Sequence, residues 1–355
     1  MNFAERRVLF ITPFYMLLQF FLIKYLVLLI YPVNDVFIVP VACLIGVDHF
    51  APMLFESKKS RRISRFLTAV DGVWMWATVF FLIDVVVIYI IKMFVNPPFG
   101  IIVLLLAVVP VLGVYNYHKA HKLTVNEKTL KLKNLSEDIN IVHFSDVHFG
   151  SIRHKQIIRQ ISDKLQELDE TCDVAIISGD LADGSSAVDE DDFLEFKNVK
   201  MPIIFTPGNH DFYRGIENVI KACKKAGIIV LDNEGMKFKN LNIYGLTFSF
   251  ENRDAPSLSE TLINPDMVNI INYHVPYHWS QFSSLGFDIQ LSGHTHGGQF
   301  YPAVNFSEIL FKYNKGLFKN DDEKFLHVTT GVGSMGTPMR WGTDSELVIL
   351  KLRKL

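Results

Sequence analysis

One stretch near the start of this chain constrains its fold more than any other, because Val8 to Tyr31 is an almost unbroken apolar run. Within these 24 residues only Gln19 and Lys24 are strongly polar. About 20 apolar residues in a helix are enough to cross the hydrocarbon core of a bilayer. The run therefore predicts a membrane-spanning helix, and with it a protein of the cell membrane.

Three further apolar segments follow within residues 1–118, at Val36–Phe55, Val73–Ile91 and Phe99–Tyr115. The segment Val36–Phe55 is the weakest of them, because it contains a proline, a glycine, an aspartate and a histidine. It could span the bilayer or lie in it as a re-entrant or interfacial segment. We expect about four spans, so that residues 1–118 form a multi-pass α-helical transmembrane domain.

The basic residues beside these segments predict the orientation. With four spans, all the basic clusters fall on one side of the membrane, which the positive-inside rule makes the cytoplasm: Arg6, Arg7, Lys58, Lys59, Arg61, Arg62, Arg65, Lys119 and Lys122. The domain after the last span is then expected in the cytoplasm. A rival interpretation takes Arg6-Arg7 as a twin-arginine export signal, but the apolar run is long for one and no small-residue cleavage site ends it. If one segment does not span, the domain moves to the other side.

Charged residues inside the apolar segments need partners. A central lysine or aspartate costs about 2.5–3.5 kcal/mol on insertion scales. Lys24 and Asp84 lie at similar depth if each helix rises by about 1.5 Å per residue. We predict that they form a structural ion pair, with an ion path as the alternative. Asp48 is a third such charge.

After Lys122 the pattern changes to short apolar runs of the kind that form strands. At first these runs alternate with segments of helical periodicity, and later in the chain they follow one another. This order predicts two packed sheets with helices outside. The formal net charge of the whole chain is −2, so no basic field favours nucleic acid as a partner. The three cysteines are too scattered for a disulfide framework or a Cys-x-x-Cys metal site.

Five of the predicted strands end in residues that bind metals. In chain order these ends are Asp-Val-His at 146–148, Gly-Asp at 179–180, Gly-Asn-His-Asp at 208–211, His274, and Gly-His-Thr-His at 293–296. Each alone is more simply a turn residue or a structural histidine. Five strand ends are much harder to explain that way together, because strand ends at one sheet edge are where α/β folds place ligands. The set predicts a metal site built from carboxylate, amide and imidazole donors.

The ordered set D-x-H, G-D, G-N-H-D, H and G-H-x-H resembles the calcineurin-like metallophosphoesterase superfamily over roughly residues 120–355. The segments Gly293–Gln299 and Gly331–Arg340 resemble its branch of membrane-associated phosphoesterases. The resemblance implies a four-layer α/β/β/α sandwich at residues 119–355, with two metal ions at the strand ends. The fold class expected for the whole chain is this α/β sandwich preceded by the transmembrane domain.

By motif position, the resemblance also implies the ligands of two divalent ions. One ion would be held by Asp146, His148 and His296, the other by Asn209, His274 and His294, with Asp180 bridging them. Two cations about 3.5–4 Å apart lower the pKa of a bridging water, so that hydroxide is available at neutral pH. Mixed nitrogen and oxygen donors without a thiolate suit Mn²⁺, Fe or Zn²⁺.

Three more residues are candidates for the reaction itself. In the family, the residue at the position of His210 is catalytic, and His210 could protonate the leaving oxygen or stabilise charge on the phosphate. Asp211 could orient His210 or could cap the following turn. Arg340, which lies in one of the motifs, is the best candidate for a cation that binds the substrate phosphate. The alternative is an ordinary surface arginine.

These observations predict a membrane-anchored, dinuclear metal-dependent phosphoesterase that hydrolyses a phosphate ester with metal-activated hydroxide. Tethering beside a bilayer favours a phospholipid or lipid-linked phosphate, including a phosphodiester, and a soluble nucleotide-type ester stays open. The stretch Phe300 to Phe318 could face lipid or pack in the core. The alternatives are a non-catalytic metal-binding scaffold and a regulatory domain of a membrane complex. Protein partners are left open.

Overall fold

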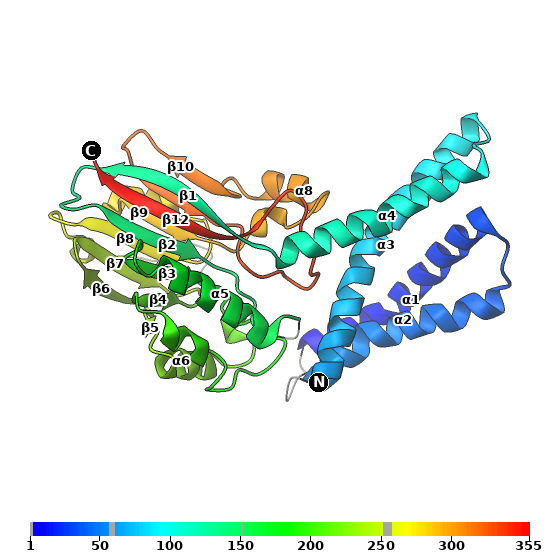
Figure 1. Ribbon diagram of the computed structural model, residues 1–355, viewed down its shortest axis with the longest axis horizontal. Coiled ribbons are helices and arrows are strands. Elements are labelled where there is room, and N and C mark those ends of the chain that lie inside the picture. Colours follow the sequence, from blue (N-terminus) through cyan, green and yellow to red (C-terminus); the bar gives the residue numbers. More distant parts are fainter. Residues whose placement is uncertain (1–2, 57–60, 151, 251–257) are drawn as a thin grey trace. The chain divides into compact units, whose positions relative to one another are not determined.

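The computed structural model describes residues 3–56, 61–150, 152–250 and 258–355, with the backbone alone at 3–9 and 51–56. The side chains of Arg6, Arg7, Lys58 and Lys59, used above for orientation, lie outside this description. The chain divides into two compact units (Figure 1). The first unit comprises Met1–His118 with Gly336–Met339, and the second comprises Lys119–Met335 with Arg340–Leu355.

Four helices make up the first unit: α1 (Phe3–Ile30), α2 (Asp35–Glu56), α3 (Arg62–Phe94) and α4 (Phe99–His121). Three stretches of the described chain are long and apolar enough to cross a membrane: Phe10–Ile30, Arg62–Phe94 and Phe99–His121. They correspond to the first, third and fourth predicted spans. The segment predicted as the second span is helical as α2, and the side chains of its last turns are not among those described.

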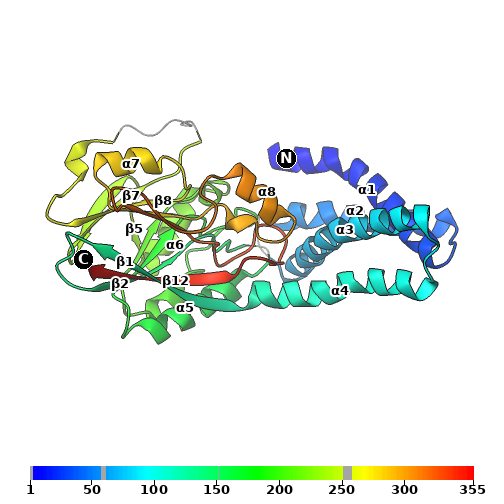
Figure 2. The same ribbon diagram turned by 90° about the horizontal axis from the view of Figure 1, so that it is seen from above.

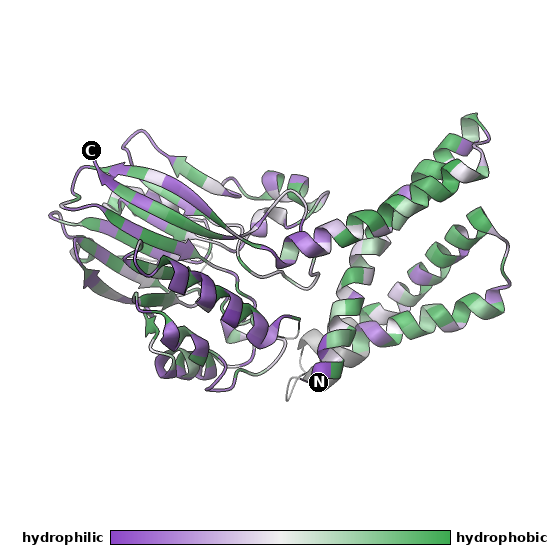
Figure 3. Ribbon diagram, in the orientation of Figure 1, coloured by the Kyte–Doolittle hydropathy of each residue, from purple (hydrophilic) through white to green (hydrophobic). Residues whose placement is uncertain are grey.

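Hydrophobic residues predominate along these helices (Figure 3), and many of their described apolar side chains are exposed. A few polar side chains bond one another between helices. Gln19 of α1 is fully buried, donates to Thr78 Oγ1 at 3.0 Å and accepts from Trp74 Nε1 at 3.0 Å. Polar groups that bond one another between helices while apolar side chains face outward are the arrangement expected in a bilayer.

The predicted ion pair between Lys24 and Asp84 is wrong. Lys24 Nζ lies 2.8 Å from Asp35 Oδ2, and Asp84 Oδ2 is buried with no hydrogen-bond partner among the described residues. The reason is local, since only residues 31–34 separate α1 from α2. The short connection brings the first residue of α2 within reach of a lysine near the end of α1.

The second unit contains two six-stranded sheets. The order of the first sheet is β1 (Leu123–Leu132), β12 (Ser345–Lys354), β2 (Ile139–Phe144), β3 (Val174–Ser178), β4 (Ile203–Thr206) and β5 (Ile229–Val230). The order of the second is β10 (Gly316–Lys319), β11 (Phe325–Val328), β9 (Ile289–Ser292), β8 (Val268–Tyr273), β7 (Leu241–Leu246) and β6 (Glu234–Phe238). The α-helices are α5 (His154–Leu168), α6 (Ile216–Lys225), α7 (Trp279–Leu285) and α8 (Ala303–Leu310).

Alternation of side chains along the strands produces the layers. In β2, Ile141 belongs to the core between the sheets, whereas Val142 and Phe144 belong to the core beneath α5 and α6. In β8, Ile270 faces the inter-sheet core and Ile271 packs with Phe282 of α7. Helices thus cover the outer faces of both sheets (Figure 2). The predicted four-layer α/β/β/α sandwich is confirmed.

The directions of the strands bring the predicted metal ligands together. β2, β3 and β4 are mutually parallel in one sheet, and β7, β8 and β9 are parallel in the other. Within each sheet, the carboxyl ends of these parallel strands therefore lie along the same edge. All five motifs predicted to bind metal follow the strands β2, β3, β4, β8 and β9.

Candidate metal centre

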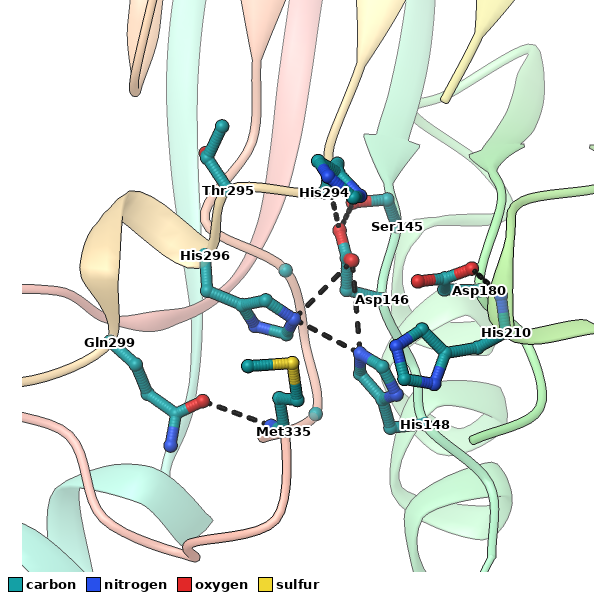
Figure 4. A network of polar contacts seen from close by, with 12 residues as sticks. Ser145, Asp146, His148, Asp180, His210, His294, Thr295, His296, Gln299 and Met335 are labelled. Atoms are coloured by element: carbon teal, nitrogen blue, oxygen red, sulfur yellow. Dashed lines mark hydrogen bonds and ion pairs between the residues drawn. The ribbon is translucent and has the colours of Figure 1, made fainter. Parts of the chain in front are cut away.

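The first group of predicted ligands forms a tight triangle of donor atoms. His148 Nε2 lies 3.0 Å from His296 Nε2, and Asp146 Oδ1 lies 3.8 Å and 3.4 Å from these two nitrogens (Figure 4). All three side chains are buried. Atoms at such separations can all stand about 2.0–2.2 Å from one cation.

Asp146 shows which of its oxygens is available to a cation. Its Oδ2 accepts a hydrogen bond from the backbone nitrogen of His294 at 2.9 Å and one from the Ser145 hydroxyl. Its Oδ1 is buried and has no hydrogen-bond partner in the described part of the chain. An unpaired buried carboxylate oxygen is costly, and a metal ion would satisfy it. The donor set therefore fits a bound cation.

A second group of ligands lies beside the first. His274 Nε2 is 3.1 Å from Asp180 Oδ2 and 3.2 Å from His294 Nδ1, which in turn lies 3.1 Å from Asn209 Oδ1. His274 Nδ1 lies 2.7 Å from the carbonyl oxygen of Ser178 and donates to it. This bond orients the ring with Nε2 toward the other donors, as is usual for histidines that bind metals.

The backbone at these ligands is strained. Asp146, His148, Asp180, His294 and His296 all have φ between 48° and 72°, the left-handed region that non-glycine residues rarely adopt. Each such residue costs on the order of 1–3 kcal/mol, and this strain persists only where the surrounding structure enforces it. Each turn directs its side chain from a strand end toward the common site.

The protonation of the first triangle suits metal binding. Burial, together with the neighbouring imidazole of His296, holds the pKa of His148 well below its ordinary value. Burial and then the charge of Arg340 do the same to the pKa of His296. Both rings are therefore neutral at physiological pH and present lone pairs.

His274 and Asp180 behave differently, because they form an ion pair when no cation is bound. Burial alone would lower the pKa of His274, but the charge of Asp180 outweighs it and raises this pKa to about 10. Burial would raise the pKa of Asp180, but the charge and hydrogen bond of His274 lower it overall. At neutral pH the metal-free pair is thus a protonated imidazole beside a carboxylate.

This ion pair predicts proton release on metal binding. Because His274 is protonated below a pH of about 10 and a metal needs its lone pair, binding should release about one proton at neutral pH. The affinity of this site should rise about tenfold per pH unit until the pH approaches that value. Calorimetric titration of metal-free protein with Mn²⁺, in buffers of different ionisation enthalpy, counts the protons. Release that persists unchanged in an His274→Ala variant would contradict the assignment.

His210 lies beside both groups. Its backbone nitrogen donates to Asp180 Oδ1 at 2.8 Å, and its ring stands edge-on to that of His148, with centroids 4.8 Å apart (Figure 4). Its Nδ1 lies 2.9 Å from the carbonyl oxygen of Asp183. With Nδ1 donating to that carbonyl, Nε2 remains for a substrate or a cation. The catalytic role of His210 stays a prediction.

The prediction that Asp211 is a catalytic partner of His210 is wrong. The Asp211 carboxylate accepts hydrogen bonds from the backbone nitrogens of Asp180 at 2.9 Å, Gly208 at 2.8 Å and Ala182 at 2.8 Å. Burial and the charge of Asp180 raise the pKa of Asp211 to about 7, against the hydrogen bonds from Ala182 and Gly208 and the charge of His274. Asp211 instead ties the loop after β3 to the loop after β4.

Arg340 is also not placed to bind substrate. It is fully buried, and its guanidinium donates to the carbonyl oxygens of Thr330 at 2.8 Å, Gly331 at 3.1 Å and Asp344 at 2.6 Å. A fourth bond, to Gly333, has a length of 2.6 Å. Both terminal nitrogens of the guanidinium donate to backbone carbonyl oxygens, whereas Nε is buried with no hydrogen-bond partner among the described residues. Arg340 therefore holds the loop between β11 and β12 rather than a phosphate.

Sequence reasoning missed the groups that orient the ligands. The carbonyl oxygens of Ser178 and Asp183 position His274 and His210, and the hydroxyl of Ser145 supports Asp146. Backbone carbonyls leave no mark in a sequence. Only Ser145, which directly precedes a predicted ligand, could have been noticed.

Comparison with known proteins agrees with the resemblance. The family model described as calcineurin-like phosphoesterase matches residues 139–298. An uncharacterized metallophosphoesterase of Helicobacter pylori is 28% identical over 239 residues, which cover 64% of this chain and 63% of that protein. The uncharacterized protein YpbG of Bacillus subtilis is 30% identical over 216 residues, which cover 58% of this chain and 80% of that protein.

A transmembrane protein with metallophosphoesterase domain from Danio rerio is 26% identical over 278 residues, which cover 71% of this chain and 62% of that protein. The chain thus spans less than two thirds of the length of the H. pylori and D. rerio relatives.

Proposed function

This chain belongs to the calcineurin-like phosphoesterase family, and from that premise we propose that it is a membrane-anchored phosphoesterase that uses two divalent metal ions. The observation that carries the proposal is the position of Asp180. Its carboxylate lies within 4.8 Å of donor atoms of His148 on one side and of His274 and His294 on the other. One carboxylate is thus within reach of two cation sites.

The residues have distinct roles in this proposal. Asp146, His148 and His296 hold one ion, Asn209, His274 and His294 hold the other, and Asp180 is shared. Bound divalent ions of the Mn²⁺, Fe or Zn²⁺ type supply a water of lowered pKa and neutralise phosphate oxygens. With protons on both ring nitrogens, His210 can donate from Nε2 a proton to the leaving oxygen or a hydrogen bond to the phosphate. The bonds of Asp211 and Ser178 keep the ligands in place without contacting substrate.

The substrate is a phosphate ester, and we infer that a phosphodiester or phospholipid-type ester suits an enzyme tethered to a bilayer. The basic residues beside the spans support a cytoplasmic position for the second unit, provided that α2 also crosses the membrane. Among the described residues of this cluster are Arg61, Arg62, Arg65 and Lys119.

Removal of the metal tests the proposal. Full-length protein in detergent should hydrolyse bis(p-nitrophenyl) phosphate or p-nitrophenyl phosphate when Mn²⁺ is present. Treatment with a chelator should abolish turnover, because no described residue of the site can replace the charge of two cations, and Mn²⁺ should restore it. The ratio of the two rates ranks diester against monoester. Two bound ions without turnover of either ester would favour the non-catalytic scaffold.

A further inference from the structure

The helix α8, which begins at Ala303 a short way after the Gly-His-Thr-His motif, carries an apolar ridge that the described rest of the second unit leaves exposed. Phe306, Ile309 and Leu310 are 63%, 80% and 75% exposed. Residues spaced by three and four positions lie on one face of a helix. Val304 and Ser307 of the same helix are buried, so this helix is held in the fold by its other side. A contiguous group of exposed apolar residues marks a contact surface, whereas single exposed apolar residues are common on any protein.

The chain that follows α8 forms an aromatic groove. Pro276, Tyr277 and His278 form one wall, and Phe311, Lys312 and Tyr313 form the other, around a cavity of about 190 Å³. The rings of Tyr277 and Phe311 are nearly parallel, with centroids 6.1 Å apart. Most of the lining is therefore carbon, with the exposed Lys312 at the rim.

The groove is continuous with both the ridge and the candidate metal centre. Phe311 follows Leu310 directly, and its ring centroid is 6.0 Å from that of His294, a predicted ligand. The opposite wall begins two residues after His274, another predicted ligand. An apolar path thus runs from the exposed face of α8 to the edge of the metal centre.

The second unit continues directly from a helix that is long and apolar enough to cross a membrane. Only Lys122 separates α4 from β1. Within the second unit, Gln160 of α5 donates to the carbonyl oxygen of His121 at 3.0 Å, and Arg153 donates to that of Ala120 at 3.3 Å. Lys119 Nζ lies 3.0 Å from Asp344 Oδ1. The last turn of a helix that can span the membrane is therefore bonded into the fold that carries α8.

We propose that the ridge of α8 inserts into the adjacent lipid leaflet, and that the centre takes an amphipathic phosphate ester whose apolar tail lies in the groove of Tyr277 and Phe311. The proposal rests on the proposed function for its substrate, but not for the insertion of α8. A bilayer is the occupant that the chain itself favours, since three of its described helices are long and apolar enough to cross a membrane and one of them, α4, leads directly into the second unit. Lys312 beside the ridge suits the anionic phosphates at a leaflet surface.

The insertion is tested without reference to activity. A nitroxide is attached at Ile309→Cys in full-length Cys43→Ser protein, in nanodiscs of phosphatidylcholine with a minority of phosphatidylglycerol. Cys172 and Cys223 are buried and should not react. The nitroxide at residue 309 should collide more often with oxygen, which dissolves in lipid, than with a water-soluble nickel chelate. A label at Glu308→Cys, on the opposite face of α8, should show the reverse. A label at 309 that is as accessible to the chelate as the one at 308 would overturn the insertion.

The substrate class is tested with two diesters that differ only in the tail. Hydrolysis of p-nitrophenyl hexadecyl phosphate in nanodiscs is compared with that of p-nitrophenyl methyl phosphate in solution. The variant Ile309→Ser/Leu310→Ser should lower the ratio of the two rates by about tenfold or more, because it removes the apolar contact with the leaflet. Leu355→Ser, at an exposed leucine of the same unit, should leave the ratio unchanged.

The outcomes separate the two proposals. Turnover of the methyl ester with an unchanged ratio in the α8 variant would overturn the lipid substrate and leave the phosphoesterase standing. No turnover of either ester, with the label at 309 in lipid, would overturn the proposed function and support the membrane contact. A label exposed to water, together with an unchanged ratio, would point to a protein partner for the ridge and overturn the inference.

Discussion

Replacement of Asp180 by Asn is expected to lower ester hydrolysis by about 10³-fold or more, because in the proposed dinuclear centre its carboxylate would be shared by both cations. Asp180 Oδ2 lies 3.1 Å from His274 Nε2, and its Oδ1 accepts from the backbone of His210 at 2.8 Å. An amide can keep the second bond, but it cannot bridge two cations with two anionic oxygens. The fold should therefore persist while the second ion is lost.

The measurement combines turnover of bis(p-nitrophenyl) phosphate with the metal content of the purified variant. We expect a fall in bound metal along with the fall in rate. Asp138→Asn serves as the matched control, since Asp138 is exposed and precedes the first residue of β2, at the opposite end of that strand from Asp146. Normal turnover in Asp180→Asn would remove Asp180 from the site, and normal metal content without turnover would restrict it to catalysis.

Gly293→Ala is expected to disable the site although it removes no ligand. A Cβ at residue 293 would overlap Ser145 Oγ and Asp146 Oδ2, both of which are buried. The packed surroundings cannot yield, so the Asp146 carboxylate must move from its place in the donor triangle. We expect at least about a hundredfold loss of activity, the size seen when the supporting shell of a metal site is disturbed.

The control for this prediction is Gly235→Ala in β6. A Cβ there would meet its nearest neighbours at 3.6 Å, an ordinary van der Waals contact. Turnover and metal content should stay near those of the unmodified protein, and circular dichroism should show both variants folded. Full activity of Gly293→Ala would mean that Asp146 is not held as the structure describes.

The parts of the site that could be predicted from the sequence are those that depend on residue type and order. Strands with buried apolar runs ended at Asp146, Asp180 and His274, and parallel pairing then had to bring those ends to shared edges. The order of the helical and strand-like segments likewise predicted two packed sheets. Neither step requires knowledge of a particular contact, because a strand's period and direction follow from its backbone geometry.

The errors have a common physical cause. Lys24 was assigned a partner from its charge and its depth in the predicted span, whereas Asp211 and Arg340 were assigned partners from their charge and their places in the motifs. The structure instead gives Lys24 to Asp35 across a short turn, Asp211 to three backbone nitrogens and Arg340 to backbone carbonyls. Every residue has nearly the same backbone donors and acceptors, so the sequence cannot show which of them a loop will present.

The sequence by itself determined the membrane-spanning stretches, the order of the strands that carry ligands and the chemical type of each donor, because these depend on apolar length, period and residue identity. Only the tertiary structure decided which ligand oxygen is free, which backbone groups orient His210 and His274, and that α8 leaves an apolar ridge uncovered. These features arise where segments far apart in the chain meet. Their geometry is therefore a property of the packed fold rather than of any one segment.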